Sequence, residues 1–332
     1  MTLRVGFLGV AHVHTPSYVA AFQAHPQAEI VGLYDWDAAR AAHSATQWGI
    51  PAYDLDTLLG QGLGAVVICA ENSYHRPLTE AAAGRVRAIL CEKPLATTLA
   101  DGQAMLDVLA RTGTRMQICF PVRYAMAALT LQEVLAGGAL GRVHTARTTN
   151  HGTMPGGWFV VPTLSGGGAV IDHTVHVIDL LRWLWPGVEV EEVYAEIGDS
   201  LLHASLGIDD AGLLSFTLSN GVIATLDTSW SRPPSYPIWG DVTVEMVGEQ
   251  GVVSVDVFSQ NVNLAPRDGA YRWGGYGADL DAALVGDFIA MALSDRQPSI
   301  TAWDGFKATE VALAAYASAQ RGAPIRLPLT VS

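Results

Sequence analysis

Five short runs of almost wholly apolar residues recur within the first 120 positions, and Ala-rich segments with a helical pattern separate them. Strands that are buried on both faces are continuous apolar runs, and strands that alternate with helices form parallel sheets. This rhythm therefore predicts an α/β fold built on a doubly wound parallel sheet. The five runs are LRVGFLG, EIVGLYD, GAVVICA, RVRAILC and RMQICF.

The pattern changes after about residue 122, where apolar and polar residues begin to alternate with a period of two. Such alternation, interrupted by Gly, Asn-Gly and Pro-rich turns, indicates an open and mainly antiparallel sheet with one polar face. We therefore expect two domains, a parallel-sheet domain over residues 1–122 and an α+β domain over residues 123–332. Helical patterns over about 123–136, 168–185, 277–293 and 302–321, and a strand over 142–150, complete the second domain.

Composition limits the partners that this chain can have. Lys and Arg total 19 and Asp and Glu total 32, and the resulting net charge of −13 excludes a nucleic-acid or anionic-membrane surface. Every apolar window long enough to span a membrane contains a charge or a His, so we expect no membrane partner. Half of the residues are hydrophobic, and this surplus predicts a homodimer or homotetramer that associates through the C-terminal sheet.

The cysteines indicate the redox compartment. Cys69, Cys91 and Cys119 are an odd number without metal-site spacing, and each lies near the end of an apolar run. This pattern is typical of reduced thiols in the core of a cytoplasmic protein.

The turn after the first predicted strand is a candidate cofactor site. It reads Gly9-Val10-Ala11-His12-Val13-His14, where a dinucleotide-binding fold has G-x-G-x-x-G. Gly9 can form the tight turn and Ala11 still allows close approach of a pyrophosphate, but His14 replaces the third glycine. His12 and His14 either contact a phosphate or the nicotinamide end of a dinucleotide, or are solvated or packed imidazoles. An ordinary strand-to-helix turn remains the alternative for the whole motif.

The second predicted strand ends in Asp35, at the position of the acidic residue that binds the ribose 2′-hydroxyl in dinucleotide folds. A carboxylate there repels a 2′-phosphate, and neither Trp36 nor Asp37 supplies a cation, so the pattern favours NAD over NADP. Arg40 is the one residue that could offset this repulsion. The alternative role for Asp35 is a helix N-cap, and the two roles do not exclude each other.

Lysine is rare in this chain, which contains 17 Arg but only Lys93 and Lys307. Lys93 stands in Glu92-Lys93-Pro94 at the carboxyl end of a predicted parallel strand, and such strand ends form the ligand crevice of these sheets. An ammonium can lose its proton and a guanidinium cannot, so a retained lysine indicates a need for an amine. A surface salt bridge at a turn is the alternative for Lys93, and we expect a solvated surface role for Lys307.

Gly166-Gly167-Gly168 precedes a helical pattern in which Asp172, His176 and Asp179 share one face, whereas His173 points elsewhere. Asp172 near His176 would raise the proton affinity of the imidazole and fix its orientation, as expected for a general base. A buried Asp–His pair without a catalytic role gives the same pattern. No three residues, even with His151 or His173 included, have the spacing of a known metal motif, so we expect no metal.

In their joint order these features resemble the Gfo/Idh/MocA oxidoreductase family over about residues 3–326. The residues that carry the resemblance are Gly9, Asp35, the segment Asn72-Ser73-Tyr74-His75, Glu92-Lys93-Pro94, the Gly-Gly-Gly run, and Asp172, His176 and Asp179. The resemblance implies a Rossmann domain that binds NAD or NADP, and a C-terminal sheet domain that binds a sugar, inositol or related polyol. Ala11, His14 and Glu71, which stands where the family often has Pro, depart from its pattern.

The resemblance also implies roles for individual residues. Lys93 matches the family's active-site lysine beside the nicotinamide, and Asp172 and His176 match its catalytic pair, with His176 taking the proton of a secondary alcohol. We expect cofactor contacts from Gly9, Ala11, His12, His14, Asp35, Trp36, Asn72, His75, Glu92 and Lys93. We expect substrate contacts from Asn150, His151, Trp158, Asp172 and His176, and we consider the aromatic loop from Trp230 to Trp239 a weaker candidate.

Three classes of function remain open on the sequence alone. The first is a dehydrogenase that transfers hydride between a polyol and NAD. The second is an enzyme that retains NAD and uses transient oxidation, as in glycoside cleavage or epimerisation. The third is a cofactor-sensing binding protein without turnover, against which the retained Lys93, Asp172 and His176 argue.

Overall fold

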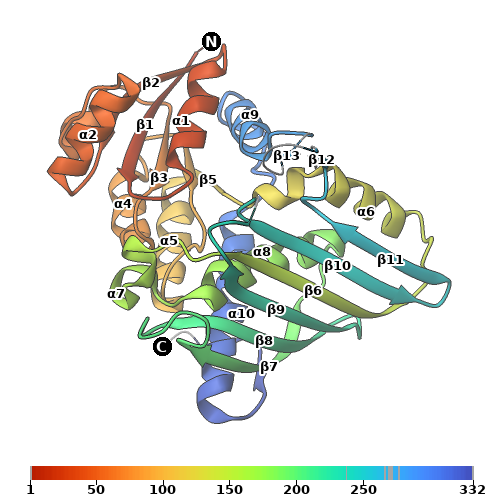
Figure 1. Ribbon diagram of the computed structural model, residues 1–332. Helices are drawn as coiled ribbons and strands as arrows, with labels where there is room; N and C mark the ends of the chain where they lie inside the picture. The colour runs from red at the N-terminus through yellow and green to blue at the C-terminus, as the bar shows by residue number, and fades with distance from the viewer. Residues whose placement is uncertain (1, 237, 265–266, 268–271, 276, 331–332) are drawn as a thin grey trace.

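The computed structural model describes residues 2–330 except 237, 265–266, 268–271 and 276. Two sheets lie side by side, one built from the first part of the chain and the other from the second, and helices pack against both (Figure 1). This arrangement confirms the predicted α/β class with a parallel N-terminal sheet and a larger, mainly antiparallel C-terminal sheet.

The N-terminal sheet has five parallel strands in the order β2-β1-β3-β4-β5. Its central strand β3 is fully buried, as predicted for a strand that helices cover on both faces. All five strands point the same way, so the loops that follow them meet at one edge. The strands are β1 (Leu3–Val10), β2 (Ala28–Tyr34), β3 (Ala65–Cys69), β4 (Ala88–Cys91) and β5 (Arg115–Ile118), and the helices between them are α1 (Thr15–Ala24), α2 (Ala38–Trp48), α3 (Leu55–Leu59), α4 (His75–Ala82) and α5 (Leu99–Thr112).

The C-terminal sheet has seven strands in the order β11-β10-β6-β9-β8-β7-β14, and only the central pair β6 and β9 runs in parallel. Its strands are β6 (Val143–Thr153), β7 (Val190–Asp199), β8 (Asp209–Leu218), β9 (Ile223–Arg232), β10 (Gly240–Gly248), β11 (Gly251–Asp256) and β14 (Ile325–Arg326). A separate ribbon pairs β12 (Asn261–Leu264) with β13 (Arg272–Gly275). The alternating pattern of the sequence places one face of the large sheet against helices and leaves the other open.

The helix that carries the predicted catalytic pair is α8 (Ala169–Leu184), which packs between the inner face of this sheet and α10 (Ala302–Arg321). The remaining helices are α6 (Met126–Ala136), α7 (Pro162–Ser165) and α9 (Leu280–Ala292), with short 3-10 turns η1 (Asn72–Tyr74), η2 (Pro121–Tyr124) and η3 (Gly157–Val160). The predicted helix over 123–136 therefore starts three residues late, because Pro121 opens a separate turn. Within the described chain, no helix is long and apolar enough to cross a membrane.

Two helices from the end of the chain return to the N-terminal half. Helix α9 packs on α1, where Phe22 and Phe288 meet edge to face, and Leu284 and Val285 enter the same buried cluster. Helix α10 contacts α5 and β5. The two sheets therefore share helices that the sequence assigned to the second domain alone.

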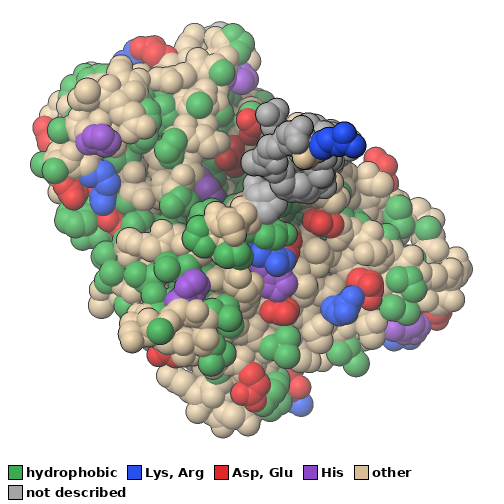
Figure 2. All heavy atoms as spheres, in the orientation of Figure 1, with side chains coloured by type: hydrophobic (Ala, Val, Ile, Leu, Met, Phe, Trp, Pro, Cys, Tyr) green, Lys and Arg blue, Asp and Glu red, His purple; other side chains and the backbone are tan. Residues whose placement is uncertain are grey.

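On the face that Figure 2 displays, the Lys and Arg side chains of the described residues are scattered among acidic and polar ones. All three cysteines, Cys69, Cys91 and Cys119, are buried and free, which confirms their prediction as core thiols.

Candidate active site

Lys93 and Asp172 form an ion pair that joins the two halves of the molecule. Lys93 follows β4 at the carboxyl edge of the parallel sheet, and Asp172 lies in the first turn of α8. The Lys93 Nζ lies 2.5 Å from Asp172 Oδ1, and the two side chains are only 5% and 8% exposed. A buried charge requires such a partner because water cannot solvate it.

Asp172 collects two further contacts from the sheet side. Trp230 Nε1 donates to its Oδ2 over 3.0 Å, and His173 Nε2 lies 3.3 Å from the same oxygen. Burial alone would raise the pKa of Asp172, but the Lys93 ammonium beside it holds that pKa well below its usual range. Asp172 is therefore an ionised acceptor that fixes the position of Lys93.

The expected contact between Asp172 and His176 is absent from the described structure. His176 Nδ1 is buried without a hydrogen-bond partner among the described residues, and its ring lies edge-on to Phe120. The two side chains do share a helix face, but the Asp172 carboxylate turns toward the cationic Lys93 rather than toward a neutral imidazole. Burial, followed by the nearby Lys93 charge, lowers the pKa of His176 well below its usual value.

His173 corrects a second expectation, because it lies in the site rather than pointing elsewhere. Its Nδ1 is bonded to the Asn150 carbonyl oxygen over 2.9 Å, and burial lowers its pKa. Neither His173 nor Trp230 was assigned as a partner of Asp172. A signal for Trp230 was available, since it shares the inward parity of Ala224 and Leu226 along β9.

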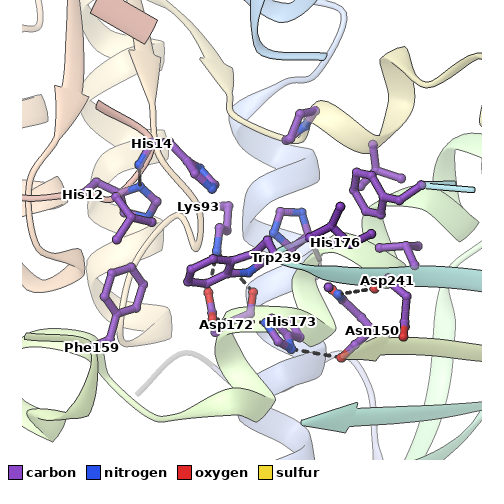
Figure 3. Close-up of a pocket in the computed structure, with 17 residues that line it drawn as sticks. His12, His14, Lys93, Asn150, Phe159, Asp172, His173, His176, Trp239 and Asp241 are labelled. Atoms are coloured by element: carbon purple, nitrogen blue, oxygen red, sulfur yellow. Dashed lines mark hydrogen bonds and ion pairs between the residues drawn. The ribbon is translucent and has the colours of Figure 1, made fainter. Parts of the chain in front are cut away.

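These groups surround a cavity of about 130 Å³ between the two sheets. In Figure 3, His12, His14 and Lys93 approach it from the parallel sheet, Asp172, His173 and His176 from α8, and Asn150 and Asp241 from the large sheet. The fold therefore brings together six of the predicted residues, which are His12, His14, Lys93, Asn150, Asp172 and His176. Phe159 and Trp239 also line the cavity.

Other predicted substrate residues lie around the cavity rather than in its wall. His151 is held between Asp241 and Asp227, at 2.9 and 3.2 Å, and the hydrogen bond with Asp241 raises its pKa. Trp158 stacks on Phe159 and donates its indole N–H to the Ala11 carbonyl oxygen over 3.0 Å.

Of the aromatic loop, Trp230 is fully buried and Trp239 lines the cavity, whereas Pro237 lies outside the described residues.

His12, His14 and Glu92 form a cluster beside Lys93, in which His12 and Glu92 are buried and the His14 side chain is 30% exposed. Glu92 Oε1 lies 3.2 Å from His12 Nδ1 and 3.1 Å from His14 Nδ1. Burial lowers the pKa of His12 to about 3, whereas the Glu92 carboxylate overcomes burial and raises the pKa of His14. Ligand atoms of the three side chains lie within 4.8 Å of one another, but the cluster stands at the positive N-terminus of α1, which disfavours a cation. We retain the prediction that no metal binds.

The end of β1 and the start of α1 form the candidate dinucleotide site. Gly9, near the end of β1, has φ +77° at an irregularity in the pairing with β3, and a Cβ there would lie 2.4 Å from the Ala70 Cβ, so only glycine permits this close approach. At the N-terminus of α1, Thr15 N already donates to the His12 carbonyl oxygen over 3.1 Å and Pro16 has no N–H, so the Ser17 amide is the first that an anion such as a pyrophosphate could use. These residues could hold NAD, which would supply the hydride acceptor.

The predicted ribose end is more crowded than expected. Asp35 accepts from Val10 N and Asp37 N, each over 2.8 Å, and from both Nε and Nη2 of Arg40. A carboxylate has about four acceptor positions, so Asp35 has none left for a ribose hydroxyl. The N-cap of α2 is Asp37, not Asp35.

His75 and Asn72 hold the backbone rather than open a cofactor surface. The buried His75 ring lies 3.0 Å from the Pro94 carbonyl oxygen and 3.3 Å from that of Ala70. Asn72 Nδ2 donates to the Ser165 carbonyl oxygen over 2.8 Å. Because His75 fixes the loop that carries Lys93, we correct its expected role from cofactor contact to support of that loop.

Comparison with known proteins agrees with this architecture. Residues 3–120 match the family described as "Oxidoreductase family, NAD-binding Rossmann fold", and residues 128–254 match "GFO/IDH/MocA C-terminal domain". The chain is 28% identical to inositol 2-dehydrogenase of Rubrobacter xylanophilus over 90% of this chain and 86% of that protein. It is 27% identical to 1,5-anhydro-D-fructose reductase of Ensifer adhaerens over 96% of this chain and 97% of that protein.

The fold is also that of a solved levoglucosan dehydrogenase in complex with NADH and levoglucosan. The TM-score is 0.85 and the sequence identity is 20%. The match covers 99% of this chain and 100% of the levoglucosan dehydrogenase chain. With family matches over both halves, the chain belongs to the Gfo/Idh/MocA family of oxidoreductases and has an NAD-binding Rossmann domain.

Proposed function

We propose that this protein is an NAD-dependent dehydrogenase that transfers hydride between a secondary alcohol of a sugar, inositol or related polyol and the nicotinamide. The observation that supports it best is the buried Lys93–Asp172 pair, which shares a cavity with His176 at the carboxyl edge of the dinucleotide-binding sheet. Relatives named as an inositol dehydrogenase and an anhydrofructose reductase act on compounds of this class.

Each residue has a distinct task in this proposal. His176 is kept neutral by burial, so it can accept the proton of the substrate hydroxyl. Lys93 donates a hydrogen bond to the same oxygen and stabilises the negative charge that develops there. Asp172 holds the Lys93 ammonium in place, and NAD, when bound, accepts the hydride.

The test is NADH formation with a panel of inositols, aldoses, sugar acids and sugar nucleotides. With the best substrate, Lys93→Ala and His176→Ala are each expected to lower turnover by about two or more decades, the scale of oxyanion and acid–base groups, while NADH binding persists. His43→Ala, which alters an exposed histidine of α2, serves as the control. Full turnover in both active-site variants would show that the roles are misassigned, and conversion of substrate without net NADH would favour transient oxidation.

The open face of the large sheet supports the proposed homo-oligomer. Leu213, Ile223 and Val252 are 58%, 56% and 63% exposed on β8, β9 and β11, and apolar patches of this kind are typical of subunit interfaces. We expect light scattering to give a dimer or tetramer mass and Leu213→Glu to reduce it. A monomeric mass for the unaltered protein would remove this proposal. The three free thiols support a cytoplasmic location.

A further inference from the structure

Glu71 is a buried carboxylate that the proposed chemistry does not use. It follows β3 at the carboxyl edge of the parallel sheet, and its side chain is 1% exposed. Glu71 Oε1 accepts from Arg40 Nη2 over 2.9 Å, and Oε2 accepts from Trp36 Nε1 over 2.9 Å. Glu71 therefore fixes two side chains of the segment that follows β2.

Arg40 is held by two carboxylates at once. Its Nε and Nη2 donate to Asp35 over 2.9 and 2.7 Å, and Nη2 donates to Glu71 as well. The guanidinium also lies over the Trp36 ring, 5.3 Å from its centroid. Two carboxylates around one guanidinium give this group of three side chains a formal net charge of −1.

This charge lies where dinucleotide folds distinguish NAD from NADP. The acidic residue at the end of the second strand faces the adenosine ribose, and a nearby arginine with free donors is what accommodates a 2′-phosphate. Here Asp35 has no acceptor left, and only Nη1 of Arg40 donates to no described residue. Discrimination between NAD and NADP therefore depends on the net charge of Asp35, Arg40 and Glu71 and on how tightly Arg40 is held.

We propose that Glu71 is a specificity-determining residue that makes the enzyme reject NADP, by neutralising Arg40 and fixing it against Asp35. The proposal rests on the proposed NAD-dependent function. Asp35 alone would leave a neutral pair with Arg40, which a phosphate could engage. Glu71 supplies the second negative charge and the second anchor.

The test measures binding rather than turnover, by fluorescence titration with NADH and NADPH. The unaltered protein is expected to bind NADH at least about tenfold more tightly. Glu71→Gln keeps the shape and removes the charge, so we expect NADPH affinity to rise about tenfold, the effect of one charge at short range in a partly solvated site, while NADH affinity changes less than about threefold.

Two further variants separate specificity from structure. In Glu71→Gln/Arg40→Gln the gain for NADPH is expected to vanish, because the freed guanidinium is then missing. Glu29→Gln removes a carboxylate of β2 that pairs with Arg4 of β1 at 3.3 Å, and is expected to change neither affinity. Melting temperatures show whether each variant is folded.

Three results would overturn the proposal. They are an unaltered protein that binds NADPH as tightly as NADH, a Glu71→Gln variant with unchanged NADPH affinity, and parallel changes in both affinities. The first result needs no variant to fold. If neither dinucleotide binds, the dehydrogenase proposal itself fails, whereas loss of turnover in Lys93→Ala leaves the binding comparison intact.

Discussion

At the scale of single residues, the site is organised around one carboxylate. Asp172 meets Lys93 through Oδ1, and Trp230 and His173 through Oδ2. A carboxylate with donors on both oxygens cannot rotate freely, so the Lys93 amine has one position relative to α8. Of the two side chains that donate to Asp172, Lys93 and Trp230, the Trp230 indole is the uncharged one.

Trp230→Phe tests whether this neutral donor positions Lys93. The ring volume is largely kept, but one buried acceptor loses its partner, which costs about 1–3 kcal/mol of unfolding free energy. We expect kcat to fall about tenfold with little change in the KM for NAD, because the Asp172 carboxylate that positions Lys93 loses one of its fixed contacts. Trp303→Phe, which alters an exposed tryptophan of α10, is the control. A fall in stability with an unchanged kcat would assign Trp230 a packing role only.

The sequence predicted Lys93, Asp172 and His176 as neighbours because each stands at a definite place in a regular element. It did not predict that Asp172 bonds to Lys93 rather than to His176, since helical spacing fixes which side chains share a face but not which way a carboxylate turns. The Asp35–Arg40–Glu71 contacts were missed for a similar reason. Arg40 was noted as a cation near Asp35, but Glu71 is 31 positions away and joins only when β2 and β3 flank β1.

At the scale of elements, α8 is capped from outside its own sequence. Gly168 precedes the helix and supplies no side-chain cap, and the Gly168 and Val170 amides instead donate to Asp209 of β8, each over 2.8 Å. A Cβ at Gly168 would lie 1.9 Å from the Asp209 carbonyl oxygen. The glycine run thus permits a strand to dock against the start of the helix that carries Asp172 and His176.

Asp209→Ala is expected to lower the unfolding free energy by about 1–2 kcal/mol, the usual cost of a lost cap, and to reduce turnover because the first turn of α8 loses its anchor. Urea unfolding and steady-state kinetics measure the two effects. Asp199→Ala alters an exposed carboxylate of β7 and provides the comparison. Unchanged stability in Asp209→Ala would mean that the Tyr316 hydroxyl, which also receives the Gly168 amide, is a sufficient cap.

The predicted elements themselves were largely confirmed, because their signals are local. Continuous apolar runs gave the five parallel strands, and period-two segments gave β7 to β11. The parallel pairing of β6 with β9 and the return of β14 to the sheet edge were not predicted. Both depend on which strands meet in space, and the alternation of side chains is the same for either direction of pairing.

At the scale of the whole molecule, ion pairs attach α8 to the segment that links the two sheets and to α10. Arg123, just after β5, donates to Asp179 of α8 over 2.8 Å, and Asp304 of α10 accepts from Arg182 over 2.9 Å. Buried histidines are a second global feature. Burial lowers the pKa of His12, His75, His173 and His176, so the folded protein keeps these rings neutral where the unfolded chain protonates them.

This difference predicts a pH dependence of stability. The folded pKa of His12 is about 3, below its unfolded value, so the unfolded chain binds more protons and the unfolding free energy falls as pH drops below about 6.5. His12→Gln removes the contribution of this histidine. Between pH 6.5 and 4.5 we therefore expect the unfolding free energy of the variant to fall less steeply with decreasing pH than that of the unaltered protein, and the two slopes to differ by about 1.4 kcal/mol per pH unit. Urea unfolding across this range measures both slopes, and His43→Gln is expected to retain the steeper one. Equal slopes for all three proteins would contradict a neutral buried His12.

The packing of α9 on α1 has a consequence for recombination between relatives. A chimaera that exchanged residues 1–122 alone would strip Phe22 of Phe288 and leave the buried cluster around α1 to meet a foreign helix. A unit that can be exchanged between relatives must therefore combine two separate stretches of the chain, because residues 280–292 pack with the domain that contains the first five strands.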